Sequence, residues 1–242
     1  MFLEFLKIPV GDPVAITFFM GYIAMFAASI FFFIERGSVD GKWKLSLLVS
    51  GLITFIAAVH YYYMKDFYVV TGENPTALRY IDWTLTVPLM CVEFYLITKK
   101  AGAKMSLLWK LIFASVIMLV TGYLGETIYR DSSVMWGVIS GAAYFYIVFL
   151  VWKGEVAQLA ANAGPAVAKA VKVLFWFVLV GWAIYPLGYI LGTPGGFLGI
   201  WVPGEDSEYY KQIMDIVYNV GDAINKIGFG LVVYSLACKK SA

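Results

Sequence analysis

The sequence predicts an all-α membrane protein built as a bundle of seven transmembrane helices. Of the 242 residues, 61% are hydrophobic and only 14% are charged, whereas soluble domains carry about 25% charged residues. A helix needs about 20 apolar residues to cross a bilayer, so the chain has room for about seven spans in a single domain of residues 1–242. The formal charge of +2 gives no reason to expect a nucleic-acid partner.

Seven apolar stretches have the length that a bilayer crossing requires. They cover residues 13–35, 43–65, 77–98, 105–124, 133–153, 168–193 and 208–237. Residues 154–167 and 192–207 are rich in small residues, Gly or Pro, and are predicted as loops with frayed helix ends. The N-terminus lacks the basic start and cleavage site of a signal peptide, so the first span is expected to direct insertion.

Lysine and arginine are distributed unevenly between the two ends of these spans. If the spans alternate in direction, one side receives Arg36, Lys42, Lys44, Lys99, Lys100, Lys104, Lys110, Lys153, Lys169, Lys172, Lys239 and Lys240. The opposite side receives only Lys7, Lys65, Arg130 and Lys211. Because cytoplasmic loops are enriched in Lys and Arg, the N-terminus is expected outside the cell and the C-terminus in the cytoplasm.

The last span carries Asp222 and Lys226, which lie on one helix face, one turn apart. A lysine near the bilayer centre costs at least ~2.5 kcal/mol, so it should face the interior and have a partner. A structural ion pair is the alternative interpretation. Cys91 and Cys238 are too few and too deep in apolar sequence to predict a disulfide framework or a metal site.

The third span adds Arg79, Asp82, Thr86 and Glu93. Glu93 lies eleven residues after Asp82, which places it about 16 Å further along the helix and roughly on the same face. Asp82 is expected at the depth of Lys226, where two carboxylates and two cations form a neutral cluster of the kind that survives burial. Taken alone, Arg79 could be a snorkelling anchor and Glu93 an interfacial carboxylate.

Aromatic residues of the sixth span predict the walls of an elongated apolar pocket. Trp182, Tyr185, Pro186 and Tyr189 recur at helical spacings, and the alternative is core packing around a proline kink. Residues of the third and fourth spans could close the pocket, namely Tyr80, Trp83, Met118 and Gly122.

The segments FFFIER, RYIDWTLTVPL, GWAIYPLGY and IVYNVGDAINKIGFGL resemble the microbial rhodopsins, most closely the proteorhodopsins, from about Phe19 to the C-terminus. The resemblance implies retinal bound to Lys226 as a protonated Schiff base. It implies Asp82 as primary proton acceptor, Asp222 as second counterion and Glu93 as cytoplasmic proton donor. The implied function is a light-driven outward proton pump, not an enzyme, in the cell (inner) membrane of a bacterium.

Further positions match the same pattern. Thr86 completes the Asp-Thr-Glu triplet of outward proton pumps, and Arg79 matches the arginine below the counterion. His60, the only histidine, matches one that hydrogen-bonds the acceptor aspartate, although a lone histidine on an apolar helix is more often structural. Met90 stands where Leu accompanies green and Gln blue absorption, so its apolar side chain favours green.

Other positions depart from the pattern or leave alternatives open. Gly137 replaces a bulky aromatic and, as in xanthorhodopsin-like relatives, could open a window for a carotenoid antenna; close helix approach is the alternative. The resemblance implies a homo-oligomer, pentamer or hexamer, but Phe19 replaces a Trp that contacts the neighbouring protomer. Asp215 is a candidate for the proton exit path, with an ordinary interfacial carboxylate as the preferred interpretation.

Rival functions are distinguished by single residues. Sodium-pumping relatives carry Asn and Gln where this chain has Asp82 and Glu93, and sensory relatives commonly lack the donor carboxylate. A photosensor that signals through a transducer is the alternative function. A receptor or carrier without retinal would leave Lys226 unmodified.

Overall fold

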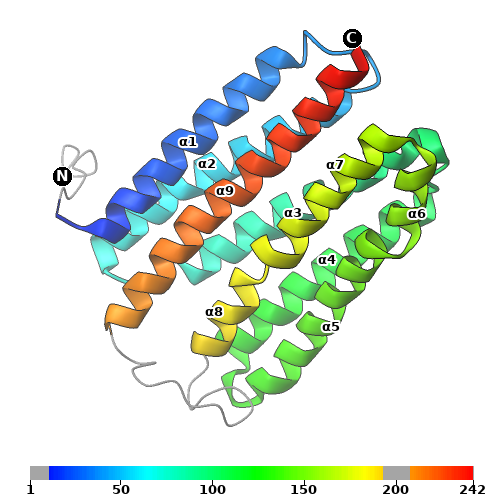
Figure 1. Cartoon of the computed structure of the whole chain (residues 1–242). Helices are drawn as coiled ribbons and strands as arrows, with labels where there is room; N and C mark the ends of the chain where they lie inside the picture. The colour runs from blue at the N-terminus through cyan, green and yellow to red at the C-terminus, as the bar shows by residue number, and fades with distance from the viewer. Residues whose placement is uncertain (1–10, 193–207, 242) are drawn as a thin grey trace.

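Long helices packed side by side make up the computed structural model, which describes residues 11–192 and 208–241 (Figure 1). The main helices are α1 (Pro13–Glu35), α2 (Lys44–Thr71), α3 (Thr76–Thr98), α4 (Met105–Tyr123), α5 (Ser133–Trp152), α6 (Glu155–Asn162), α7 (Pro165–Trp176), α8 (Ile184–Gly192) and α9 (Glu208–Ser241). The short helical turns between them are η1 (Lys99–Ala101), η2 (Leu124–Ile128), η3 (Arg130–Ser132) and η4 (Phe177–Gly181).

Seven of the described helical segments are long and apolar enough to cross a membrane, which confirms the predicted fold class. The spans are Pro13–Glu35, Lys44–Thr71, Thr76–Ala101, Met105–Ile128, Arg130–Asn162, Pro165–Tyr189 and Gln212–Lys239. We call the face where α1 begins the N-side and the face where α9 ends the C-side. Successive spans alternate in direction, so α3 and α9 both run from the N-side to the C-side (Figure 1).

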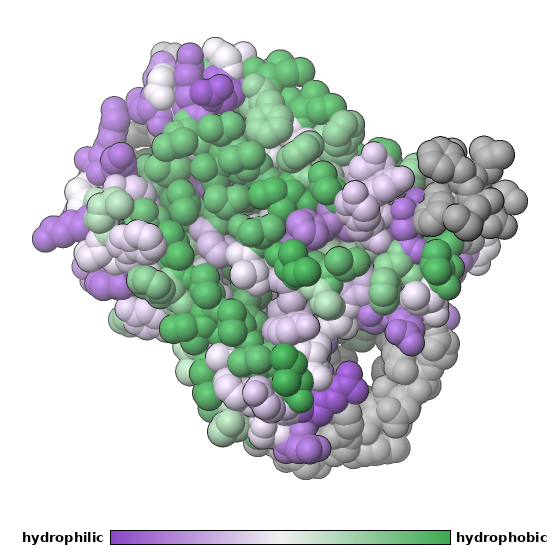
Figure 2. Space-filling model, turned by 180° about the vertical axis from the view of Figure 1, so that it is seen from behind, coloured by the Kyte–Doolittle hydropathy of each residue, from purple (hydrophilic) through white to green (hydrophobic). Residues whose placement is uncertain are grey.

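The two central helices are the ones that carry the intramembrane charges. α9 packs on α1, α2 and α7, while α3 packs on α2 and α4 (Figure 1). Asp82 and Lys226 are consequently buried in the middle of the bundle. The outer surface is apolar: Figure 2 shows a broad hydrophobic flank, with hydrophilic residues gathered mainly toward the ends.

The predicted loop at residues 154–167 is wrong in part, because α6 occupies most of it. Its sequence EVAQLAAN is rich in Ala, Glu, Gln and Leu, which are strong helix formers. The chain then turns at Gly164, whose φ of 102° is readily adopted by glycine. Pro165 starts α7 at the first helical position, where its missing N–H costs nothing. The other predicted loop, 192–207, lies almost wholly outside the described residues.

The sixth span is bent, but the irregularity begins before its proline. A π-helical turn, η4, separates α7 from α8, and Pro186 lies in the first turn of α8. The carbonyl of Trp182, four residues before the proline, accepts instead from the N–H of Tyr185 at 3.1 Å. A proline clashes with the carbonyl four residues earlier, so the regular helix ends upstream of Pro186.

Side chains from neighbouring helices satisfy the carbonyl groups of this turn. Tyr144 on α5 donates to Val178 O at 3.1 Å and to Leu179 O at 2.7 Å. Asn225 on α9 donates from Nδ2 to Gly181 O at 2.8 Å. The turn is therefore fixed to both neighbouring helices, and a buried irregular backbone keeps its polar groups paired.

Candidate functional site

The centre of the site is the ammonium group of Lys226. Its Nζ lies 2.5 Å from Asp82 Oδ2 on α3 and 2.5 Å from Asp222 Oδ2 one turn earlier on α9. All three side chains are almost completely buried. An ammonium group flanked by two carboxylates is stabilised in a low-dielectric interior, so this ion cluster links helix α3 to helix α9 in the middle of the bundle.

His60 lies beside this centre but does not form the predicted hydrogen bond to Asp82. Its Nδ1 is 3.8 Å from Asp82 Oδ1, beyond hydrogen-bond distance, and lies 2.9 Å from Ile56 O of its own helix. Asp82 Oδ1 is buried and has no hydrogen-bond partner among the described residues. The imidazole can act on Asp82 through space only, while one carboxylate oxygen remains able to accept a proton.

Arg79 is paired with Asp215 and not with the two central carboxylates. Its Nη2 donates to Asp215 Oδ1 and to Asn219 Oδ1, both at 2.8 Å. The guanidinium carbon lies 5.0 Å and 5.2 Å from the ring centres of Phe18 and Tyr218. Arg79 and Asp215 are each only 2% exposed. Asp215 is therefore not an interfacial carboxylate, and the preferred interpretation of that residue is wrong.

The predicted neutral cluster accordingly has one more acid than expected. Asp215 stands with Arg79 one layer toward the N-side, and Asp82 with Asp222 surrounds Lys226. The sequence places Asp215 seven residues before Asp222, two helical turns away on the same face of α9. This spacing is the signal that could have paired Asp215 with Arg79.

Glu93 lies on the C-side of the centre, completely buried. Its Oε1 accepts from Ser50 Oγ on α2 at 3.1 Å, and its Oε2 has no partner among the described residues. Next to it, Phe94 and Phe229 pack edge to face with ring centres 5.6 Å apart. Thr86, between Asp82 and Glu93 on α3, donates to the backbone carbonyl of Asp82 at 2.9 Å.

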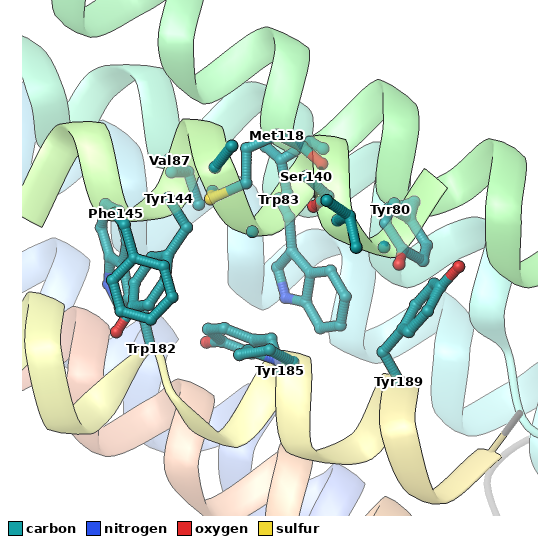
Figure 3. Close-up of a pocket in the computed structure, with 17 residues that line it drawn as sticks. Tyr80, Trp83, Val87, Met118, Ser140, Tyr144, Phe145, Trp182, Tyr185 and Tyr189 are labelled. Carbon is teal, nitrogen blue, oxygen red and sulfur yellow. Dashed lines mark hydrogen bonds between the residues drawn. The ribbon is translucent and has the colours of Figure 1, made fainter. Parts of the chain in front are cut away.

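A cavity of about 470 Å³ lies beside the charged centre (Figure 3). The predicted pocket residues that line it are Tyr80, Trp83, Met118, Gly122, Gly137, Trp182, Tyr185, Pro186 and Tyr189, whereas Met90 is buried in the core without lining it. In Figure 3, Tyr80 and Tyr189 stand at one end, Trp182 and Phe145 at the other, and Trp83 and Tyr185 lie between.

Tyr185 connects the cavity to the charged centre. Its ring lines the cavity and lies 4.6 Å from the ring of Trp83, centre to centre. Its hydroxyl donates to Asp222 Oδ1 at 2.8 Å. The cavity and the ion cluster therefore share one wall, which allows a group on Lys226 to extend into apolar space.

The other polar side chains of the lining turn their hydrogen-bonding groups to the protein. Tyr80 donates to Glu126 Oε2 at 2.7 Å, Tyr189 to Ser133 O at 2.6 Å, and Ser140 to Met118 O at 2.7 Å. Because these donors are already paired, the cavity presents mostly aromatic and aliphatic carbon. Its preferred ligand is an elongated apolar molecule.

This geometry defines the class of protein: a seven-helix membrane protein that holds a lysine between two carboxylates, beside a long apolar cavity. The model of the family described as bacteriorhodopsin-like protein matches residues 12–240. The chain belongs to this family, whose members bind retinal on a lysine through a Schiff base. It is a multi-pass protein of a bacterial cell membrane.

Individual relatives agree with this assignment. The chain is 41% identical to the blue-light absorbing proteorhodopsin of Gamma-proteobacterium Hot 75m4 over 235 residues, or 96% of this chain and 89% of that protein. The crystal structure of the blue light-absorbing proteorhodopsin from Med12 is 39% identical and superposes with a TM-score of 0.77, covering 95% and 100% of the two chains. Xanthorhodopsin, described as a light-driven ion pump with dual chromophore, is 25% identical with a TM-score of 0.80, covering 94% and 93%.

The residues present fit a retinal. Lys226 offers an amine, Asp82 Oδ1 offers a buried acceptor that has no partner in the described part of the chain, and the cavity offers aromatic walls beyond Tyr185. Two carboxylates at 2.5 Å would stabilise a positive charge on the lysine nitrogen after a Schiff base forms. The donor set therefore suits a cationic, apolar chromophore.

Several supporting residues are missing from the sequence-based prediction. Ser50 bonds Glu93, Glu126 bonds Tyr80, and Asn219 links Arg79 to Thr17 Oγ1. Ser46, Ser50 and Thr54 recur at four-residue intervals on α2, a polar stripe that indicates a buried contact. Glu126 carried no such signal, because it stands near the end of an apolar stretch, where carboxylates are normally solvated.

Proposed function

We propose that this protein is a light-driven outward proton pump with retinal bound to Lys226. The observation that carries the proposal is the order of buried carboxylates along the bundle. Asp82 contacts the lysine nitrogen, Asp215 lies toward the N-side with Arg79, and Glu93 lies toward the C-side. A proton on the lysine nitrogen thus has an acceptor on one side and a donor on the other.

Each carboxylate has one part in the cycle. Bound retinal supplies a light-driven reorientation of the N–H on the lysine nitrogen. Asp82 accepts that proton at Oδ1 or Oδ2, while Asp222, held by Tyr185, remains the second counterion. Glu93, buried on the C-side with one carboxylate oxygen bonded by Ser50, returns a proton from that side. Arg79 and Asp215 form the first polar pair on the exit side.

The direction of transport follows from the orientation of the chain. In the sequence, twelve lysines and arginines flank the span ends that lie on the C-side, whereas only four, including Lys7 outside the described residues, flank the opposite ends. The positive-inside rule places the C-side in the cytoplasm. Protons therefore enter toward Glu93 from the cytoplasm and leave past Asp215 to the outside.

Illumination of retinal-loaded cells in unbuffered salt tests the proposal. We expect external acidification that a protonophore abolishes, and loss of this signal in Asp82→Asn, which also absorbs at longer wavelength. Asp131→Asn, an exposed acid on η3, is the matched control that should still acidify. Alkalinisation enhanced by the protonophore would indicate a sodium pump instead, and slow cycling without net transport would favour a photosensor. Lys226→Ala should form no covalent pigment.

A carotenoid antenna is a second ligand that the cavity supports. Gly137 lines the cavity near the outer surface of α5, and xanthorhodopsin, a structural relative, is described as having a dual chromophore. A missing side chain at this position leaves room for a polyene to approach the retinal. Carotenoid-band excitation should drive acidification in the natural chain and fail to do so in Gly137→Trp. An action spectrum without a carotenoid contribution in both proteins would exclude the antenna.

We also propose a homo-oligomer, pentameric or hexameric, formed through α1 and α2. The outer faces of these helices carry exposed aromatic residues, among them Phe26, Tyr62 and Tyr63. Tyr22 packs on both Phe26 and Tyr62, which makes a continuous aromatic surface across the two helices. Native mass spectrometry from lipid discs should report five or six copies, and Phe26→Ala with Tyr62→Ala should lower that number.

A further inference from the structure

One stripe of α5 belongs to the cavity and to the outer surface at the same time. Val138, Gly141, Ala142 and Phe145 recur at helical spacing and all line the cavity. Val138 is 57% exposed and Phe145 is 63% exposed. A residue can line an internal cavity and remain exposed only where the cavity reaches the surface. The cavity therefore opens through the side of the bundle.

Two hydrogen bonds between α5 and the sixth span mark the two ends of this opening. Tyr189 on α8 donates to Ser133 O near the N-side, and Tyr144 on α5 donates to Leu179 O toward the C-side. Ser133 and Tyr144 are eleven residues apart, or about 16 Å along the helix. The opening therefore extends along α5 between these two contacts.

Small residues keep the space between these contacts free. Gly141 lies between them, one turn before Tyr144, and a Cβ added there would meet no other atom within 4 Å. On the opposite side of the opening, Pro186 lines the cavity and is exposed, and Trp182 lies buried behind it. The opening faces the hydrocarbon part of the bilayer, because it lies within the apolar spans Arg130–Asn162 and Pro165–Tyr189.

We infer that this opening between α5 and α8 is the entrance through which retinal reaches Lys226 from the bilayer. The inference rests on the proposed attachment at Lys226. Retinal is an apolar aldehyde that dissolves in lipid, and exposing its apolar surface to water is unfavourable. A lateral entrance avoids that cost. Pigment then forms by condensation of the aldehyde with the lysine amine, releasing one water.

Order-of-addition labelling tests the entrance. The full chain carries Ala142→Cys in a Cys238→Ser background and is produced without retinal in carotenoid-free lipid discs. The remaining cysteine, Cys91, is buried. A bulky maleimide is added either before or after retinal from loaded vesicles, and pigment formation is followed in the dark by absorbance. Labelling first should slow pigment formation about tenfold, a barrier increase of about 1.4 kcal/mol. Labelling after pigment formation should leave the colour in place.

Ile117→Cys provides the matched control, because Ile117 is 48% exposed on α4 and does not line the cavity. Its labelling should not slow pigment formation. Equal rates for labelled and unlabelled Ala142→Cys would overturn the entrance, as would equal slowing at both positions. Phe145→Ala, which widens the opening, should accelerate uptake. Position-dependent pigment formation without light-driven acidification would leave the entrance standing and reject the pump, whereas no pigment in any variant would reject the attachment itself.

Discussion

Glu93 accepts a hydrogen bond from the Ser50 hydroxyl, so its function as donor can be separated from its position. Glu93→Gln removes the proton and should slow reprotonation of the lysine nitrogen at least about tenfold, because general acid catalysis is lost. Ser50→Ala keeps the proton but removes the bond to Oε1, worth about 1 kcal/mol, and should slow the same step about fivefold. Flash photolysis measures both rates.

Ser50→Thr is the control for this residue, since it restores a hydroxyl at the same place. It should return the rate toward that of the natural chain. A photocycle of normal speed in Glu93→Gln would remove Glu93 as the donor. Normal speed in Ser50→Ala alone would mean that the buried carboxyl holds its place without the α2 hydroxyl.

Met90 is the residue that we expect to tune the absorption maximum. It lies one turn beyond Thr86 on α3, fully within the core, and presents no hydrogen-bonding donor. Met90→Gln should shift the absorption maximum toward blue, because the resemblance to proteorhodopsins associates an amide here with blue absorption. Met90→Leu should keep green absorption. Spectra of the purified pigments measure the shift, and identical maxima for the Gln and Leu variants would exclude tuning at this position.

At the scale of elements, the pair Arg79–Asp215 fastens α3 to α9 on the N-side of the charged centre. Removing one partner leaves the other buried and uncompensated, a loss of about 3–5 kcal/mol in stability. We therefore expect Arg79→Gln and Asp215→Asn each to lower the unfolding temperature strongly. The double variant should be less destabilised than the sum of the two, because neither charge is then left alone.

Thermal unfolding of the two single variants and the double variant in the same detergent gives the coupling energy between Arg79 and Asp215. Lys110→Gln, which breaks the exposed pair with Glu155 on the surface, is the comparison and should change stability little. Additive losses for Arg79 and Asp215 would show that their contact contributes no coupling energy.

The sequence predicted well those elements whose signal is periodic. Seven spans follow from hydropathy, and the depth of Asp82, Asp222 and Lys226 follows from helix rise alone. Loop assignment failed at α6, because small residues favour both loops and helices and only packing on α5 and α7 decides between them. The bend at η4 was expected at Pro186, although its steric effect is felt one turn earlier.

Partner choice was less predictable than position. Arg79 could face either the central carboxylates or Asp215, and a one-dimensional pattern does not say how far α3 and α9 are rotated toward each other. The hydrogen bond expected from His60 to Asp82 fails for a similar reason: Ile56 O, one turn earlier on the same helix, is the nearer acceptor for the ring. The relative rotation of α3 and α9 decides the first case, and the orientation of the His60 side chain decides the second.

For the whole molecule, the direction of pumping depends on which face of the bundle meets the cytoplasm. The N-side and C-side differ in Lys and Arg content, so we expect the C-side inside. Single cysteines report this in a Cys238→Ser background: Glu73→Cys in the exposed turn after α2, and Lys100→Cys on η1, lie on opposite faces. A membrane-impermeant maleimide should label Glu73→Cys in intact spheroplasts and Lys100→Cys only after lysis.

The inverse labelling pattern would make the same order of carboxylates pump inward, since Glu93 would then face the outside. Light-driven pH changes measured on the same spheroplasts connect the two observations. Acidification together with external Glu73→Cys is the expected combination, because proton uptake at Glu93 and release past Asp215 are fixed relative to the bundle. Acidification with external Lys100→Cys would instead require that the acceptor and donor exchange places, and would contradict the assignment of both carboxylates.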